Sequence, residues 1–458
     1  MSFFPKIFPL IFLFPNLILG QNHLENYIEY ALEYNVALTQ KNLSYEKSLA
    51  ALEEAKSMFF PTLALKARYS MAGGGRTFDI PTGDLVNPIY SNLNLINAIG
   101  KANDPTYPDI GEYPQIPNEQ VNFLRSREHE TKLQLAFPVF NSAILNNHRI
   151  KENLAQTERI SVDIYKKELI KEVKVSYYNY LKAREFAKLL SENTMDLVNE
   201  NLRTAESLFR NQKVTIDEVY AAQAQVKEVE QQLAEAQKNQ YVAQAYFNFL
   251  LNKEFNSPVE ITDPRDFPKN ALSVNAARQL AFQTREEFQQ LNYAMAAADN
   301  KIKLDKGDRL PNLTLVGDYG FQGTDYSFTG EDDFVMGSLV LHWDIFNKTT
   351  KRKVEQSRID RQIIEQKKVE TRQQIGLQVV NAFFDLEAAR KKIELSEAQK
   401  EAAQKAFRLV NKKYTQGQAN LVQFTDARTR LTNSEQQLII SKYDYQIRLA
   451  EFGRIIGK

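Results

Sequence analysis

Two long segments without strong helix breakers constrain this fold most. Residues 141–209 and 347–414 span 69 and 68 residues, and Gly376 is the only Pro or Gly in either segment. Because Pro and Gly are the residues that interrupt helices, each segment predicts one continuous helix. A helix of that length is roughly 100 Å long, about three times the diameter of a small domain. The chain is therefore not expected to be an ordinary globular enzyme.

The two segments belong to an internal repeat. Phe140-Asn141 matches Phe346-Asn347 at an offset of 206, and Phe209 matches Tyr414 at an offset of 205. Gln231-Gln232-Leu233 matches Gln436-Gln437-Leu438, and residues 61–65 match residues 311–315 at an offset of 250. We expect a first repeat over 21–257, a linker over 258–272 and a second repeat over 273–458. The first repeat carries about 44 extra residues, which predict a long loop over 73–130.

The N-terminal residues are typical of an export signal. Lys6 precedes a nearly all-apolar run over 7–19, and Gly20 follows it. This order predicts a cleaved signal peptide over 1–20. The alternative is a membrane anchor, but 13 residues broken by Pro9 and Pro15 are too few to span a bilayer. No later stretch reaches 18 apolar residues, so the sequence predicts no membrane-spanning helix after the signal.

Each repeat contains two segments in which apolar and polar residues alternate, as in strands with two different faces. A half-buried sheet of a soluble domain would give this pattern, and so would a membrane β-barrel. Aromatic residues at the segment ends favour the barrel. Four strands cannot close a barrel, so two chains would give eight strands and three would give twelve. The residues expected to face lipid are Leu63, Leu65, Tyr69, Leu133, Leu135, Phe137, Leu313, Leu315, Tyr319, Leu339, Leu341 and Trp343.

The remaining helices are expected near residues 24–58, 215–253, 276–306 and 420–456. Two of them carry 3–4 apolar spacing, for example Val219, Ala222, Val226 and Val229, which indicates coiled-coil packing. Short turns precede both. Thr215 with Glu218, and Asn420 with Gln423, predict capping boxes, and Gly417 suits a left-handed helix end. These features alone support no more than structural helical hairpins.

Composition argues against catalysis and against nucleic-acid binding. The chain has no Cys, and its four His lie in separate elements, so the sequence predicts no catalytic, cofactor or metal site. Gly73-Gly74-Gly75 lacks the phosphate-loop pattern. The charges of the 58 basic and 57 acidic residues nearly cancel, so the sequence lacks the excess of positive charge that is typical of nucleic-acid-binding proteins.

The signal peptide, tandem repeat, two strand hairpins and tip turns together resemble the TolC-type outer-membrane efflux protein family, the outer membrane factors. Tyr414-x-x-Gly417-x-x-Asn420 is the turn closest to the family pattern. The resemblance implies a mainly α fold with a membrane β-barrel portion. Three protomers would share a 12-stranded barrel in the bacterial outer membrane and an α-helical tunnel reaching into the periplasm. Residues 73–130 would form an extracellular loop.

The resemblance also implies a function. The chain would be the passive exit duct of a tripartite efflux pump or a type I secretion system, working as a homotrimer with a periplasmic adaptor and, through it, an inner-membrane transporter. Tip residues would narrow the tunnel: Tyr414 and Asp426 stand at matching positions, Gln423 replaces an acid, and Asp217 and Glu218 bring acids close. Asp426 is also explained as an ordinary carboxylate at a helix start. The alternative function is an exported periplasmic coiled-coil adaptor or scaffold with a soluble β domain.

Overall fold

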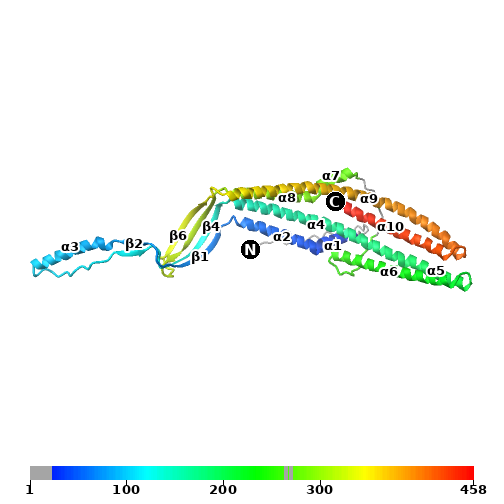
Figure 1. The fold of residues 1–458 in the computed structure, drawn as a ribbon, viewed down its shortest axis with the longest axis horizontal. Coiled ribbons are helices and arrows are strands. Elements are labelled where there is room, and N and C mark those ends of the chain that lie inside the picture. Colours follow the sequence, from blue (N-terminus) through cyan, green and yellow to red (C-terminus); the bar gives the residue numbers. More distant parts are fainter. Residues whose placement is uncertain (1–22, 263–266, 268–271) are drawn as a thin grey trace, which may run out of the picture. The chain divides into compact units, whose positions relative to one another are not determined.

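The computed structural model describes residues 23–262, 267 and 272–458 and is mainly helical (Figure 1). The expected signal peptide and most of the expected linker lie outside these residues. The chain divides into two compact units. A helical unit contains the described residues up to 53 with 147–303 and 353–458, and a strand unit contains 54–146 and 304–352.

In the described part of the chain, nine α-helices contribute to the helical unit: α1 (His23–Tyr34), α2 (Val36–Ser57), α4 (Ser142–Lys188), α5 (Met195–Arg210), α6 (Ile216–Leu250), α7 (Val274–Thr284), α8 (Glu286–Gly307), α9 (Lys348–Thr415) and α10 (Leu421–Ile455). The long helix expected over 347–414 is confirmed, because α9 is one helix of 68 residues. Two expected helices are broken. Asn35 separates α1 from α2, where its side chain accepts from the Leu38 N–H at 3.0 Å and donates to the Leu250 carbonyl at 2.8 Å. Arg285, with extended backbone, separates α7 from α8.

The prediction of one continuous α-helix over 141–209 is wrong at one turn. A π-helix, η1 (Leu189–Thr194), lies between α4 and α5. A π turn accommodates one additional residue without changing the helical phase on either side. The repeat offsets show that additional residue directly, since they fall from 206 at Phe140 to 205 at Phe209. The π turn is therefore where the first repeat absorbs the one residue that α9 lacks.

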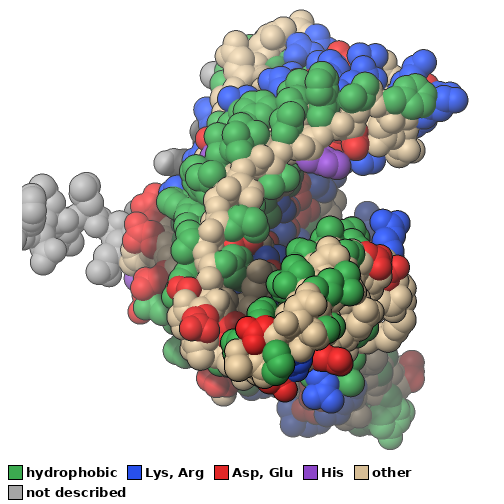
Figure 2. Space-filling view, turned by 90° about the vertical axis from the view of Figure 1, so that its left-hand side faces the viewer, with side chains coloured by type: hydrophobic (Ala, Val, Ile, Leu, Met, Phe, Trp, Pro, Cys, Tyr) green, Lys and Arg blue, Asp and Glu red, His purple; other side chains and the backbone are tan. Residues whose placement is uncertain are grey.

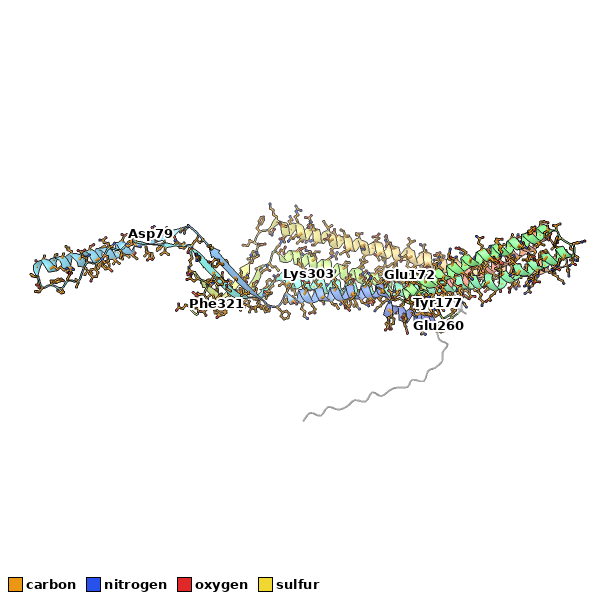
Figure 3. All side chains as sticks on the ribbon, turned by 90° about the horizontal axis from the view of Figure 1, so that it is seen from below. Asp79, Glu172, Tyr177, Glu260, Lys303 and Phe321 are labelled. Atoms are coloured by element: carbon orange, nitrogen blue, oxygen red, sulfur yellow. The ribbon has the colours of Figure 1, made fainter. Side chains whose placement is uncertain are left out.

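Several apolar clusters hold the helices together. One contains Tyr27, Tyr177 and Phe247, and the Tyr177 hydroxyl accepts from the Thr262 N–H at 2.8 Å (Figure 3). The heptad prediction is confirmed at most positions: Val219, Ala222, Val226, Val229, Ala236, Phe247 and Leu250 are buried on α6, and Phe424, Ala427, Leu431, Ser434, Ser441, Tyr445 and Phe452 are buried on α10. Small residues at these positions let α9 and α10 approach closely, so that the Ser396 and Ser441 hydroxyls lie 2.9 Å apart.

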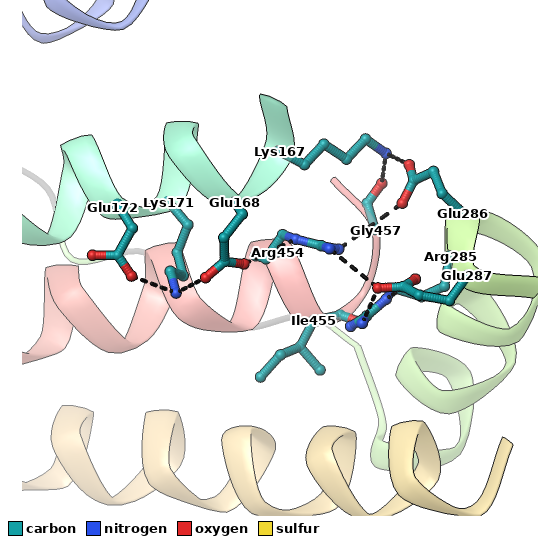
Figure 4. A network of polar contacts seen from close by, with 10 residues as sticks. All are labelled: Lys167, Glu168, Lys171, Glu172, Arg285, Glu286, Glu287, Arg454, Ile455 and Gly457. Carbon is teal, nitrogen blue, oxygen red and sulfur yellow. Dashed lines mark hydrogen bonds and ion pairs between the residues drawn. The ribbon is translucent and has the colours of Figure 1, made fainter. Parts of the chain in front are cut away.

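A charged network fastens the end of α10 (Figure 4). Arg454 is 7% exposed; its Nη2 lies 3.2 Å from Glu287 Oε1 and its Nε lies 3.4 Å from Glu168 Oε2. Lys167 Nζ donates to the Gly457 carbonyl at 2.8 Å. Burial alone would raise the pKa of Glu287, but the hydrogen bonds and charge of Arg285, with the charge of Arg454, hold it below its usual range. The network joins α4, α8 and the C-terminus of α10.

The strand unit is built on one antiparallel sheet in the order β1-β4-β5-β6. Its strands are β1 (Thr62–Met71), β4 (Arg127–Phe140), β5 (Asn312–Gly323) and β6 (Asp333–His342). Each repeat supplies one neighbouring pair, as the sequence predicts, and β4 pairs with β5 across the repeats. Among the described residues the outer edges of β1 and β6 have no partner strand.

The long segment between β1 and β4 is not an irregular loop, so this part of the sequence prediction is wrong. It contains β2 (Thr77–Ile80), α3 (Thr82–Asn103) and β3 (Glu119–Asn122), and β2 pairs with β3. β4 also begins at Arg127, inside the range expected for the loop. Pro88, within α3, and the glycines at both ends of the helix disguise it in the sequence.

Candidate gate at the helical tips

Each helical hairpin of the repeat ends in a turn of the same construction. Gly417, between α9 and α10, has φ 72°, and Gln212, between α5 and α6, has φ 53°. In the first turn the Gln212 and Lys213 N–H groups donate to the Phe209 and Leu208 carbonyls at 2.9 Å. The equivalent bonds of the second turn are 2.9 and 2.8 Å long. The left-handed role predicted for Gly417 is confirmed, and Gln212 fills the same role without a glycine.

The two predicted capping boxes have different outcomes. Asn420 and Gln423 form the box: the Gln423 N–H donates to Asn420 Oδ1 at 2.9 Å, and the Asn420 N–H donates to Gln423 Oε1 at 3.2 Å. Thr215 occupies the N-cap of α6, but its side chain makes no capping hydrogen bond. The prediction for Thr215 and Glu218 is wrong because Glu218 does not reach back to the helix start. Its Oε2 atom is buried instead.

Tyr414 and Glu218 are brought together between the two hairpins. Tyr414 is 2% exposed and packs on Phe424, with 4.9 Å between ring centroids. Its hydroxyl and Glu218 Oε2 are both buried without a hydrogen-bond partner. Burial first, and then the charge of Glu218, raise the pKa of Tyr414 to about 12. The tyrosine therefore remains a hydrogen-bond donor throughout the physiological pH range, beside a carboxylate that has a free acceptor atom.

A short chain of polar side chains links the hairpins behind this pair. Gln225 of α6 donates to the Thr425 hydroxyl of α10 at 2.5 Å and accepts from Asn201 of α5 at 3.4 Å. Arg428 is 6% exposed, its Nε has no hydrogen-bond partner, and burial lowers its pKa while the charge of Glu228 raises it. Sequence reasoning missed these residues. Their only signal is that polar groups adjoin the heptad positions Val226 and Ala427, on the side that faces another helix.

The other predicted tip residues are not part of the buried pair. Thr215 and Asp217 are exposed. Asp426 is also exposed, and its Oδ2 lies 2.9 Å from Arg430 Nε on the same helix. A carboxylate neutralised by its own helix contributes less field to a constriction than a free one would. Among Asp217, Glu218 and Asp426, Glu218 is the one with a buried carboxylate oxygen.

A groove lies beside the tip cluster, between η1 and α5 on one side and α9 and α10 on the other. Its volume is about 640 Å³, and Glu192, Asn193, Arg203, Phe407 and Glu435 are among its lining residues. Burial raises the pKa of Glu435, against the effect of Lys400 at 3.8 Å. Glu192 and Asn193 belong to the π turn, so the additional residue of the first repeat lies directly on the groove.

The residues predicted to face lipid share one face of the sheet. The register pairs Leu63 with Leu135 and Leu65 with Leu133, and it pairs Leu315 with Leu339. Of the twelve residues predicted to face lipid, all except Leu313 are more than a third exposed. Trp343 lies just beyond the end of β6. The opposite face is polar: Lys132 Nζ lies 2.7 Å from Glu130 and 3.1 Å from Asp318. The alternation therefore creates two chemically different faces.

Among the residues that the structure describes, no group of three or more His, Asp or Glu is placed to hold a metal ion.

In the described part of the chain, no helix is both long and apolar enough to cross a membrane.

Comparison with known proteins identifies the second repeat. Residues 277–458 match the family model described as outer membrane efflux protein. The second repeat is therefore similar in sequence to this family, which agrees with the resemblance predicted from the sequence. The matched residues include α9, the tip turn with Tyr414 and Gly417, and α10 with its C-terminal network. No curated protein matches the chain significantly by sequence.

Solved structures confirm the fold over nearly the whole chain. CusC, described as forming a transmembrane channel, matches with a TM-score of 0.77 at 16% identity, over 96% of this chain and 92% of its own. The CmeC outer membrane channel of Campylobacter jejuni gives 0.72 at 14%, over 95% and 86%. The outer membrane protein VceC of Vibrio cholerae gives 0.73 at 13%, over 95% and 96%. The similarity in fold to these structures thus extends through both repeats.

Proposed function

We propose that this protein is the exit duct of a tripartite efflux pump or a type I secretion system. The observation that supports this proposal most strongly is the four-stranded sheet of the strand unit, which has one apolar face, one charged face and two unpaired edges. An exposed apolar face suits lipid, and a charged face suits a water-filled lumen. The alternative, a soluble coiled-coil adaptor or scaffold, would need that apolar face buried, yet Leu63 and Leu65 are 68% and 71% exposed.

Unpaired edges require further copies of the chain. Backbone groups cannot stay unsatisfied in lipid, so β1 of one copy would pair with β6 of the next. Three copies of four strands give a 12-stranded barrel, which is within the size range that closes. The homotrimer would carry cargo passively from an inner-membrane transporter, through a periplasmic adaptor, to the cell exterior. Nucleic acid has no part in this function, and no reaction is catalysed.

The groove beside the tip is the surface we assign to the periplasmic adaptor. It is lined by residues of both repeats, so that a partner seated in it would contact α5, α9 and α10 together. Such contacts could move one hairpin against the other, and the buried polar links between the hairpins would then have to break. Docking and opening would be coupled in this way.

Tyr414 and Glu218 form the gate in this proposal. Each has a buried atom without a partner, so a small movement of α9 toward α6 would create a charge-assisted hydrogen bond. Symmetry would repeat this bond three times around a narrow mouth. Opening would break the bonds and separate the hairpins. Asp426, Asp217 and Thr215 would line the mouth outside them.

Planar-bilayer conductance tests the proposal. We expect the purified protein to form channels with low resting conductance, and we expect Tyr414→Phe and Glu218→Gln to raise that conductance several-fold. Tyr220→Phe is the matched control, because it also removes a tyrosine hydroxyl. Tyr220 lies on α6, the helix that carries Glu218, and is 63% exposed. Asp426→Ala should raise the leak less than Glu218→Gln because Arg430 already neutralises Asp426. Absence of channels would contradict the duct, and unchanged conductance in both gate variants would contradict the gate.

A further inference from the structure

Helix α3, in the segment between β1 and β4, has the reverse of the usual arrangement of faces. A surface helix normally buries its apolar side chains and exposes its polar ones. In α3 the buried residues are Gly83 and Asn97. Leu85, Ile89, Ile96 and Ile99 are 67%, 58%, 58% and 51% exposed. Figure 2 shows hydrophobic side chains exposed among charged and other polar ones on the face it presents.

The polar face of α3 binds the chain's own return segment, residues 104–118. Asn87 donates to the Ile116 carbonyl at 2.9 Å and accepts from the Ile116 N–H at 2.9 Å. Asn94 binds both backbone groups of Tyr113 in the same way, at 2.9 and 2.8 Å. These asparagines replace a neighbouring strand and hold the return segment against the helix. The orientation of α3 is therefore fixed, and its apolar face remains outward.

Gly83 and Gly100 show how close the return segment lies. A Cβ atom at Gly83 would be 2.5 Å from the Ile116 carbonyl oxygen, and one at Gly100 would be 2.7 Å from the Tyr107 ring. Both distances are shorter than any real contact, so this face accepts only glycine at these points. The return segment thus covers the polar face of α3 closely and leaves the apolar face exposed.

The outward face has the spacing of a coiled-coil seam. Its residues are Leu85, Ile89, Asn92, Ile96 and Ile99, which follow one another at intervals of 4, 3, 4 and 3. This is a heptad pattern, in which a single Asn at a seam position sets register and oligomeric state. Asn92 is exposed in the single chain. A partner helix with an apolar seam and a polar group at the same level would satisfy it, and a copy of α3 has both.

Charge distinguishes a second copy from other occupants. No charged residue lies between Asp84 and Lys101. An amphipathic helix that binds a lipid surface is rich in Lys and Arg, so the seam does not suit anionic headgroups. α3 also follows β1, an edge strand of the sheet, in the chain, with the short strand β2 between them (Figure 1). Copies that join at the β1 edge would bring their α3 helices close together.

We propose that the α3 helices of neighbouring copies pack together as a short parallel coiled coil through the seam Leu85, Ile89, Asn92, Ile96 and Ile99. The inference rests on the homotrimer of the proposed function. Fewer than three heptads do not associate strongly by themselves, but tethering to a shared barrel raises their effective concentration.

Site-directed crosslinking in the full-length protein tests the coil. Because the sequence contains no cysteine, each variant carries a single thiol per chain. Leu85→Cys and Ile96→Cys place one thiol on the seam, whereas Ala98→Cys places one on an exposed position outside it. Treatment with a short bismaleimide should join two chains in both seam variants and in few molecules of the Ala98→Cys control. No crosslinking at the seam, or equal crosslinking at all three positions, would overturn the coil.

The native mass of the same samples separates the two proposals. A mass of three protomers without seam crosslinks would remove the coil and leave the trimeric duct intact. A mass of one protomer would remove both. Three protomers with crosslinks confined to the seam support both. A further variant, Asn92→Lys, should abolish the Ile96→Cys crosslink while the mass stays at three protomers, because three like charges would meet in the seam.

Discussion

Gln212 and Gly417 hold the same left-handed position in the two tip turns, at φ 53° and 72°. A residue with a Cβ pays about 1 kcal/mol or more for this conformation, and glycine does not. We expect Gln212→Gly to stabilise the first turn by about 1 kcal/mol, and Gly417→Gln to destabilise the second by a similar amount. Hydrogen exchange of the Lys213 and Gln418 amides would measure both changes. Unchanged or lower protection in Gln212→Gly would contradict the assignment of strain to Gln212.

Glu287 is a residue of the helical unit whose folded pKa links stability to pH. Its folded pKa is lowered, so its contribution to stability is present above the unfolded pKa and is lost as pH falls through the folded pKa. We expect Glu287→Gln to destabilise the protein by about 3 kcal/mol at pH 7, because the buried Arg454 loses a partner. The difference from the unmodified protein should shrink in strong acid.

Thermal unfolding at pH 7 and pH 3 would check this expectation. Glu394→Gln is the matched control, since that carboxylate forms an ion pair with Lys391 in which both side chains are more than 60% exposed. Such pairs contribute about 0.5 kcal/mol. Equal effects of the two substitutions at pH 7 would contradict the special role of the Arg454 network.

At the scale of elements, the π turn is an insertion that the helix tolerates. Deleting Ser191 should convert η1 to α-helix and leave α4 and α5 in phase, because it restores the length of α9. α9 has no π turn that could absorb a deletion. Deleting Gln399 from it should therefore rotate one end of the helix by about 100° relative to the other. We expect the first deletion to change thermal stability little and the second to cost about 3 kcal/mol or more. Similar losses in both would contradict the insertion.

Elements differ in how far the sequence predicts them. Period-two alternation locates all four sheet strands, and the heptads locate α6 and α10, because both patterns report burial directly. The π turn leaves only a one-residue change of repeat offset. α3 is missed because its interior pattern is inverted: its asparagines and glycines bind its own loop, and its apolar residues face outward. Asn35 and Arg285 end helices through contacts with distant residues, which local patterns do not contain.

At the tip, too, the sequence predicts residues with local contacts better than residues whose contacts lie far along the chain. Gly417, Asn420 and Gln423 act through neighbours three or four residues away, so that the sequence predicts their positions and bonds. The inward turn of Glu218 depends on Tyr414 of the other repeat, which lies 196 residues further along the chain. Arg428 and Gln225 likewise acquire their roles only when two hairpins meet. Periodicity identifies the buried side of each helix but does not identify the polar atoms that meet there.

At the scale of the whole molecule, the proposed duct needs more than one chain. The sheet of one chain has two open edges, its apolar strand face is uncovered, and the seam of α3 has no partner among the described residues. The proposed homotrimer, in which identical chains are arranged around an axis, would satisfy all three features. Three copies of four strands, the number in the proposed homotrimer, would close a barrel of ordinary size.

The most direct test of this account is the native mass of the protein extracted from outer membranes, corrected for bound detergent. The account predicts three protomers in a particle that requires detergent. A monomer or dimer that remains in solution without detergent would contradict the shared barrel, and with it the exit duct.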